Sequence, residues 1–521
     1  MEKSKISEHF NAAGYHFDKK EYDKALELIN LVLNDDKSLP NANSLKAIIL
    51  IESWDGKQET RSQIFQAIDH LKIAIKSKPN IGRYYYNLGN AWYNLALSEF
   101  EENSHQYSPE ILEKFESSKK CFGKALKLDE NYPQIWINKG NVLDYLGRYL
   151  EALECYDRAI LLNPQFYNAW GNRGLASLRL ARKNQDKCTH NLLYKNGMIY
   201  LGIELSLFPD FQIDQKSKEN VDQFLSKNKI SIDLEQFLKN FLPKKKFLLS
   251  QTFNIYTGLN RDFKSFYNNF CEQNQLFLNL ISDCKDCSCK RKDLLNIRFH
   301  TSADDETRAY EILTRWRSLI DDYKTARFFL ALAQFKHQDF DFLDKQRYDP
   351  DYSLNYFTNI EILKNSFLII MHIFDKIAFF LNEYENLKIE DNKVAFWGSN
   401  SIFTIKRSLI IDNNWQIDLM ALEGIKRELE KEDFKRLLEI RHYLVHRYFV
   451  LHDPVFYKQT EKDDDDSCKT ITNNRYHMDV DEFFNMTILA IKIIRNALFS
   501  LSFFVFEKER NIKGFPLPYN S

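Results

Sequence analysis

The sequence of 521 residues has few residues that interrupt helices, with only 15 glycines and 11 prolines. It also lacks an excess of either charge, because 72 basic and 73 acidic side chains leave a formal net charge of −1. This balance excludes a uniformly basic nucleic-acid coat protein but allows a local basic site. Hydrophobic residues make up 44% and charged residues 28%, which excludes a disordered or collagen-like chain. The scarcity of helix breakers predicts long helices.

The motifs of several common enzyme classes are missing as well. No GxxxxGK[ST] loop occurs, no GxGxxG follows a predicted strand, and there is no HExxH. Phosphotransfer driven by ATP and zinc proteolysis therefore have no support. We expect a protein that works without a cofactor.

Long apolar segments are also absent. The longest, at residues 367–374 and 497–506, reach roughly half of the ~20 residues that a membrane-spanning helix needs. Polar residues follow Met1, where a signal peptide would be apolar. The eight cysteines are mostly scattered, which argues against a disulfide framework. We expect a soluble, cytoplasmic protein with no membrane partner.

What the sequence does contain is an internal repeat. Trp136 and Trp170 are 34 residues apart, and Gly140 and Gly174 have the same spacing. Between them, small residues alternate with aromatic ones and Pro164 ends the unit, as in two antiparallel helices that touch at small side chains. The period and the residue sizes resemble the tetratricopeptide (TPR) repeat. This resemblance predicts a helical solenoid.

The repeat pattern extends beyond this unit. Tyr85 precedes Trp136 by 51 residues, which is one period plus a 17-residue insertion. We assign residues 1–210 to the TPR array, with a degenerate first unit as its cap. Because TPR arrays bind peptides or other domains, the resemblance implies an unidentified protein or peptide ligand in the groove.

The rest of the chain divides into two parts. Residues 211–305 are less regular and are predicted to form a connecting region that contains a cysteine cluster. Helical periodicity returns from residue 306, with helical regions predicted over residues 352–386, 422–451 and 480–508 and a solvated loop over 453–477. Residues 306–521 are therefore predicted as a second helical domain, which makes the fold all-α, a solenoid followed by a helical bundle.

An Arg-x4-His motif is the most informative stretch of the second domain. Arg441 and His446 define it, and His442 gives it a polar second position. Arg447 and His452 form a second match. The spacing alone is weak evidence, and a lone histidine is well explained by a structural hydrogen bond inside a bundle. The position of the motif in a helical domain behind TPR repeats strengthens it.

In this context the sequence resembles the HEPN superfamily of helical bundles. Its signature is arginine, a polar residue, three variable residues and histidine, which Arg441, His442 and His446 match. The resemblance extends to a subgroup from prokaryotic defence loci with TPR repeats in front of the HEPN unit. Members with an intact motif are implied to be metal-independent endoribonucleases that act as dimers. The implied role is a toxin or effector in antiphage defence, with the repeats as sensor or docking module.

The residue types suit cleavage of RNA without a metal. Histidine titrates near pH 6.5 and can act as acid or base at neutral pH, and a guanidinium can hold phosphoryl oxygens bidentately. We assign His446 as the acid/base, Arg441 as the phosphate clamp and His442 as a second acid/base or positioning group. The RNA 2′-OH would be the nucleophile, giving a 2′,3′-cyclic phosphate and a 5′-hydroxyl.

Four charged residues are candidates for a supporting role. Asp375 and Lys376 interrupt the apolar face of a long predicted helix, and they either support the site or form an ordinary buried ion pair. Glu439 and Arg447 flank the motif, as neighbours of the site or as surface groups.

Helix geometry adds a constraint on assembly. At about 100° per residue, Arg441 and His446 lie about 140° apart on a straight helix, whereas His442 and His446 share a face. The arginine must reach round, the helix must be irregular, or a second copy must complete the site. We expect a homodimer with the two motifs facing across a twofold axis.

Cys284, Cys287 and Cys289 form the other cluster of reactive residues. With Cys271 or His300 as fourth ligand they would bind Zn²⁺. No second CxxC pair accompanies them. We therefore assign no metal and interpret the cluster as reduced cysteines that stabilise a loop.

Two alternatives to the nuclease stay open at this point. The chain would be a non-catalytic scaffold if the bundle only dimerises or binds a nucleotide. It would be the HEPN partner of a toxin–antitoxin pair if a nucleotidyltransferase modifies a residue near the motif. Incubation of the purified protein with RNA, with and without EDTA, separates these functions.

Overall fold

The protein forms two compact units. One comprises Met1–Leu180 and Tyr194–Leu242, and the other comprises Ala181–Leu193 and Pro243–Ser521. The computed structural model describes residues 3–184, 186–208, 215–232, 234–235, 238, 262–280, 291–298, 306–335, 357–399, 401–405, 416–430, 435–452 and 475–510.

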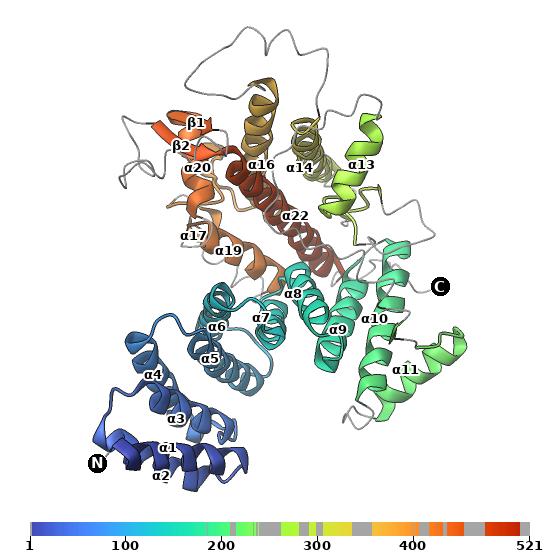
Figure 1. Ribbon diagram of the computed structural model, residues 1–521. Helices are drawn as coiled ribbons and strands as arrows, with labels where there is room; N and C mark the ends of the chain where they lie inside the picture. Colours follow the sequence, from blue (N-terminus) through green and yellow to red (C-terminus); the bar gives the residue numbers. More distant parts are fainter. Residues whose placement is uncertain are drawn as a thin grey trace. The chain divides into compact units, whose positions relative to one another are not determined.

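The first unit is a stack of antiparallel helix pairs (Figure 1). The helices are α1 (Lys3–Asp18), α2 (Tyr22–Asp35), α3 (Pro40–Glu52), the short 3-10 helix η1 (Gln58–Thr60), α4 (Ser62–Ser77), α5 (Gly82–Glu102), α6 (Pro109–Leu128), α7 (Pro133–Tyr145), α8 (Tyr149–Leu162), α9 (Tyr167–Lys183), α10 (Lys187–Leu207) and α11 (Gln215–Lys227). The turn between α9 and α10, Ala181–Leu193, belongs to the second unit.

Glycines set how closely the paired helices approach. A Cβ atom on Gly140 of α7 would lie 2.6 Å from the ring of Tyr156 on α8, and one on Gly89 of α5 would lie 2.6 Å from Phe122 on α6. Both rings are fully buried. The small and large residues of the repeat pattern therefore form the helix contacts that the sequence predicts, and the solenoid is confirmed.

The insertion before Trp136 lengthens one helix pair. α5 and α6 have 21 and 20 residues, whereas α7 and α8 have 13 and 14. Ser108 caps α6, since its hydroxyl accepts a hydrogen bond from the Ile111 N–H, and Pro109 occupies the first helical position. Most of the extra residues thus lengthen the two helices.

A buried carboxylate lies between helices α9 and α10 of the first unit. Glu204 of α10 is 4% exposed, and its carboxylate occupies the space that a side chain at Gly171 of α9 would need. Burial raises the pKa of Glu204 to about 7.

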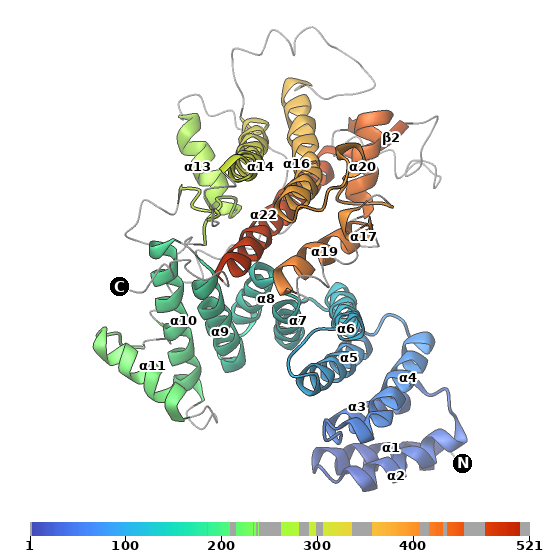
Figure 2. The ribbon, with the colours of Figure 1, turned by 180° about the vertical axis from the view of Figure 1, so that it is seen from behind.

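The second unit is built around its longest helix, α22, which runs between α14 and α16 on one side and α19 on the other (Figures 1 and 2). Phe367, Phe374 and Phe483 are fully buried in this core. The elements are α13 (Phe263–Gln273), α14 (Glu306–Leu332), α16 (Phe357–Tyr384), the 3-10 helix η6 (Asp391–Lys393), α17 (Ile402–Ile405), α19 (Ile417–Glu430), α20 (Lys435–His446), β1 (Tyr448–His452), β2 (Arg475–Asp479) and α22 (Val480–Arg510).

By length and composition α22 could cross a membrane, because its most apolar stretch has a mean hydropathy of 1.8. This helix is longer than the apolar run at residues 497–506 that the sequence singles out. However, 78% of that stretch is buried inside the protein, as in the core helix of a folded domain.

A short parallel sheet corrects the prediction for residues 422–451. Strand β1 pairs with β2, with Tyr448 opposite Arg475 and His452 opposite Asp479. β1 alternates between a 70% exposed Tyr448 and a buried Phe449, which is the period of a strand and not of a helix. The predicted loop over 453–477 is also shorter than expected, because β2 begins at residue 475; residues 453–474 lie outside the described part.

The predicted connecting region, 211–305, is divided between the units. α11 belongs to the first unit and α13 to the second. Within the second unit, both carboxylate oxygens of Asp293 accept hydrogen bonds from Arg327 of α14 at 2.7 Å, and Arg327 also donates to the Leu276 carbonyl. These contacts fasten the segment after α13 to the helical core.

Candidate active site

The motif occupies the last turns of α20. Leu437 and Ile440 are fully buried and fix this helix against the domain, where it contacts α16 and α19. The helix ends at His446, and β1 starts two residues later. The buried side chains thus orient the helix, and the strand holds its end.

Arg441 is oriented by two contacts. Its Nη2 donates a hydrogen bond to Asp375 Oδ2 of α16 at 3.2 Å, and its guanidinium carbon lies 4.9 Å from the centre of the Trp397 ring. The side chain is 35% exposed. One edge of the guanidinium is therefore held by the protein, and solvent still reaches the group.

His442 and His446 form a pair on the surface of α20. Their ring centroids are 5.3 Å apart, and both residues are exposed. Among the described residues, neither imidazole has a hydrogen-bond partner, so the structural hydrogen bond considered for His446 is not found there. The two imidazoles share a face and Arg441 contacts α16, in keeping with the angle that helix geometry predicts.

The two neighbouring candidates on α16 point to different partners. Asp375 meets Arg441; burial raises the pKa of Asp375, while the Arg441 charge, the Phe396 N–H and the His372 charge oppose the rise. Lys376 instead pairs with Asp322 of α14 at 2.5 Å. Of the two, Asp375 therefore contacts a motif residue, whereas Lys376 forms an ion pair with another helix.

The residues that flank the motif lie at the surface. Glu439 pairs with Lys435 one helical turn earlier, at 3.6 Å. Arg447 is exposed beyond the end of α20. His452, which would complete the second Arg-x4-His match, is in β1, and its side chain is outside what the structure describes. The second match is thus split between a helix end and a strand.

A cleft of about 800 Å³ opens beside the motif. His442 borders it, and the aromatic part of its wall comes from Trp397, Tyr443 and Tyr476. The remaining lining residues are Gly398, Thr404, Lys426, Glu430, Lys435, Leu438 and Glu439.

Sequence reasoning missed the aromatic residues of this cleft. Trp397 lies in the segment before α17 and Tyr476 in β2, so neither shares a periodic pattern with α20. A tryptophan beside Gly398 in a non-helical stretch is the one available sequence signal, and it specifies no partner.

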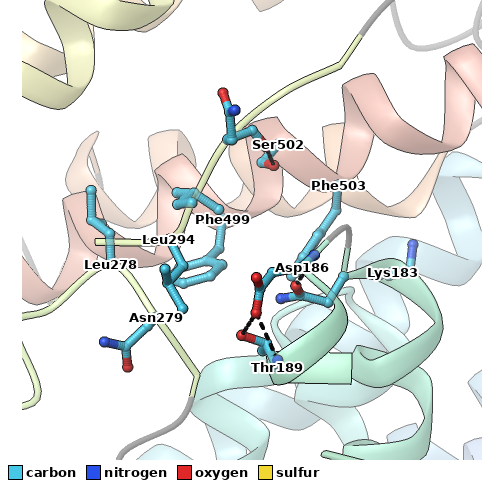
Figure 3. A pocket seen from close by; sticks show the side chains of 12 residues that line it. Lys183, Asp186, Thr189, Leu278, Asn279, Leu294, Phe499, Ser502 and Phe503 are labelled. Atoms are coloured by element: carbon cyan, nitrogen blue, oxygen red, sulfur yellow. Dashed lines mark hydrogen bonds between the residues drawn. The ribbon is translucent and has the colours of Figure 1, made fainter. Parts of the chain in front are cut away.

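A second cavity in this unit is too small for a ligand. It has a volume of about 20 Å³, enough for about one water molecule. Asp186 accepts hydrogen bonds from the N–H and hydroxyl of Thr189, both at 2.7 Å, next to Phe499 and Ser502 of α22 (Figure 3). These two bonds cap the start of α10, so the polar groups have a structural role.

The cysteine cluster falls outside the described residues, as does His300. Cys271 is described and is buried in α13, where burial raises the pKa of its thiol to about 12. Within the described ranges, no three His, Cys, Asp or Glu side chains are grouped to hold a metal ion.

Comparisons with known proteins find two matching families. Residues 304–508 match the LA2681-like HEPN family, and residues 133–166 match the tetratricopeptide repeat. The protein is therefore a helical-repeat protein with a HEPN domain. Its C-terminal part is a HEPN domain of the LA2681-like kind. A HEPN domain suggests an RNase-like function, and TPR repeats suggest a module for protein interaction.

Several solved structures match part of this chain. A crystal structure of the MamA protein has 16% identity, covers 40% of this chain and 97% of its own, and has a TM-score of 0.29. YrrB, described as a TPR protein with an unusual peptide-binding site, is 17% identical to this chain. The match covers 40% of this chain and 90% of YrrB, with a TM-score of 0.28. TTC0263, a thermophilic TPR protein of Thermus thermophilus, is 15% identical to this chain. The match covers 42% of this chain and 98% of TTC0263, with a TM-score of 0.31. Among curated proteins, no sequence matches this chain.

Proposed function

We propose that the protein is a metal-independent endoribonuclease. The observation that carries this proposal is the exposed pair of imidazoles, His442 and His446, beside an arginine that Asp375 orients, in a HEPN domain. Two adjacent imidazoles supply an acid and a base without a metal. The guanidinium supplies positive charge where negative charge develops on the phosphoryl oxygens.

The reaction that fits these groups is transfer within the RNA backbone. One imidazole takes the proton from the ribose 2′-OH as the oxygen attacks phosphorus. The bond from phosphorus to the 5′-oxygen breaks, and an imidazolium returns a proton to that oxygen. The products are a 2′,3′-cyclic phosphate and a 5′-hydroxyl. We assign His446 to one proton transfer, His442 to the other or to positioning, and Arg441 to the phosphate.

A homodimer would complete the site. Val445 is 54% exposed and Tyr448 is 70% exposed, and they flank His446 at the end of α20. Exposed apolar side chains beside a motif favour contact with another protein surface. In a twofold dimer, Arg441 of one protomer would approach the histidines of its partner, which removes the need for both groups to share a helix face.

The TPR array is proposed to bind a protein or peptide that controls the nuclease. Its helices expose large apolar side chains that a ligand would cover, among them Phe65, Tyr132 and Leu175 at 45%, 49% and 45%. A binding module joined to an RNase is the arrangement needed for a triggered toxin. We therefore propose a cytoplasmic effector in antiphage defence.

The direct test is cleavage of total RNA by the purified protein. The proposal expects fragments with 2′,3′-cyclic phosphate ends, in equal amounts with and without EDTA. Persistent absence of cleavage by wild type, also with candidate triggers from phage-infected cells, would favour the scaffold. Activity that appears only after removal of a nucleotidyl group from the protein would favour the partner of a nucleotidyltransferase.

A further inference from the structure

The cleft beside the motif has features of a binding site that the acid–base scheme does not use. Trp397, Tyr443 and Tyr476 reach it from three elements, namely the segment before α17, helix α20 and strand β2. Its volume of about 800 Å³ is in the range of small-molecule sites, roughly 300–1,000 Å³. Since His442 is part of its wall, a ligand in the cleft would lie directly beside the motif.

The aromatic rings of the cleft are suited to a flat ring. Tyr443 and Tyr476 have centroids 4.9 Å apart with planes tilted by 34°, and both residues are partly exposed, as is Trp397. Bases that are not paired in a duplex stack on such side chains in complexes of proteins with single-stranded RNA.

The charges of the cleft favour a base over a phosphate as its occupant. Lys426 pairs with Glu430 at 3.0 Å, and Lys435 pairs with Glu439 at 3.6 Å. Two ammonium groups are thus matched by two carboxylates, and the cleft offers no excess positive charge to a phosphate. Carboxylates can accept hydrogen bonds from the amino groups of a base. The positive charge is instead on Arg441, outside the cleft lining.

We propose that this cleft binds an unpaired nucleobase beside the phosphodiester that is cut, so that the substrate is single-stranded RNA. The position of the scissile phosphate rests on the proposed nuclease function, whereas the binding of the base does not. A base inside a duplex is stacked and paired and cannot enter the cleft.

Binding to a full-length His446→Ala variant tests the cleft separately from catalysis. The probes are a fluorescent adenylate decamer and a decamer of the same length and charge in which every ribose lacks its base. The adenylate decamer should bind at least about tenfold more tightly, and Tyr443→Leu should weaken its binding by about 5- to 100-fold. Tyr443→Phe should keep the affinity, as should Tyr310→Leu, a matched change of a 69% exposed tyrosine on α14.

Tyr476→Leu provides a second variant from another element and should also lower adenylate binding toward the abasic level. Equal binding of the two decamers would overturn the proposal, and so would a Tyr443→Leu variant that binds like Tyr310→Leu. A change of oligomeric mass in Tyr443→Leu, with the base preference intact, would overturn it by assigning the cleft to a second copy. If wild type never cuts RNA but the base preference and the tyrosine effects hold, the cleft proposal stands and the nuclease proposal fails.

Discussion

The guanidinium of Arg441 donates a hydrogen bond to the carboxylate of Asp375, with Nη2 and Oδ2 3.2 Å apart. The bond joins α20 to α16 and leaves the arginine 35% exposed. Asp375 therefore limits the directions in which Arg441 can point without removing it from solvent. For a group that is proposed to hold a phosphate, a fixed orientation favours the reaction more than additional flexibility does.

Loss of this contact should slow RNA cleavage. We expect Asp375→Ala to lower the single-turnover rate by about 10- to 100-fold, because a misplaced clamp stabilises the transition state less well. Lys376→Ala is the matched control on the same helix, since Lys376 pairs with Asp322, and it should change the rate less than about twofold. The thermal midpoint of each variant is measured alongside. A rate that falls only in proportion to lost folded protein would speak against a positioning role.

Substitution of the motif residues should reduce RNA cleavage far more than substitution of the neighbouring Arg447. His446→Ala should reduce cleavage by about 10²–10⁴-fold, and His442→Ala should also reduce it, through loss of proton transfer. Arg441→Lys should restore little of what Arg441→Ala loses, because lysine lacks the planar fork. EDTA should leave the wild-type rate unchanged.

Arg447→Ala should cleave RNA at a rate near that of wild type. If Arg447→Ala is inactive while His446→Ala is active, the second Arg-x4-His match is the true site.

A composite site predicts complementation between inactive chains. Arg441→Ala and His446→Ala protomers, mixed and exchanged, would form one intact site per heterodimer if arginine and histidine come from different protomers. We expect activity to return to about a quarter of wild type, from one intact site in the half of the dimers that are mixed. Light scattering would establish the dimer. No recovery in a proven heterodimer would place arginine and histidine of each site in one chain.

The buried carboxylate of the repeat array predicts a pH-dependent stability. The pKa of Glu204 is raised to about 7 in the folded chain from an ordinary value of 4.5, so the unfolded state ionises first as the pH rises. The stabilising contribution of the protonated group is complete below the unfolded pKa and is lost between about pH 4.5 and pH 7. Glu204→Gln should therefore match wild type near pH 4.5 and be more stable at pH 8.5, by at most about 3 kcal/mol.

Urea unfolding of full-length protein at the two pH values measures this difference. The matched control is Glu27→Gln, at an exposed position of α2, which should shift stability equally little at both. A Glu204→Gln variant that is no more stable than wild type at pH 8.5 would mean that the carboxylate finds a partner in solution.

Most of the fold can be predicted from local patterns in the sequence. The contact of Gly140 with Tyr156 follows from one repeat unit, because both residues belong to the same helix pair. The pairing of β1 with β2 does not follow, since it joins segments 27 residues apart that have no common period. The motif is likewise visible in α20 alone, whereas its surroundings, Asp375 and Trp397, come from distant segments. Side-chain spacing singles out the residues that we propose as reacting groups, but it does not show which residues orient them.

The central place of α22 sets an order on events during synthesis. The motif helix is made before residues 480–510, and α22, against which α16 and α19 both pack, does not exist until these residues have been added. Local helix pairs of the solenoid need no such wait. A nascent chain would therefore display folded repeats while the domain that we propose as a nuclease still lacks its central helix, which would protect the message being translated from cleavage by the proposed nuclease.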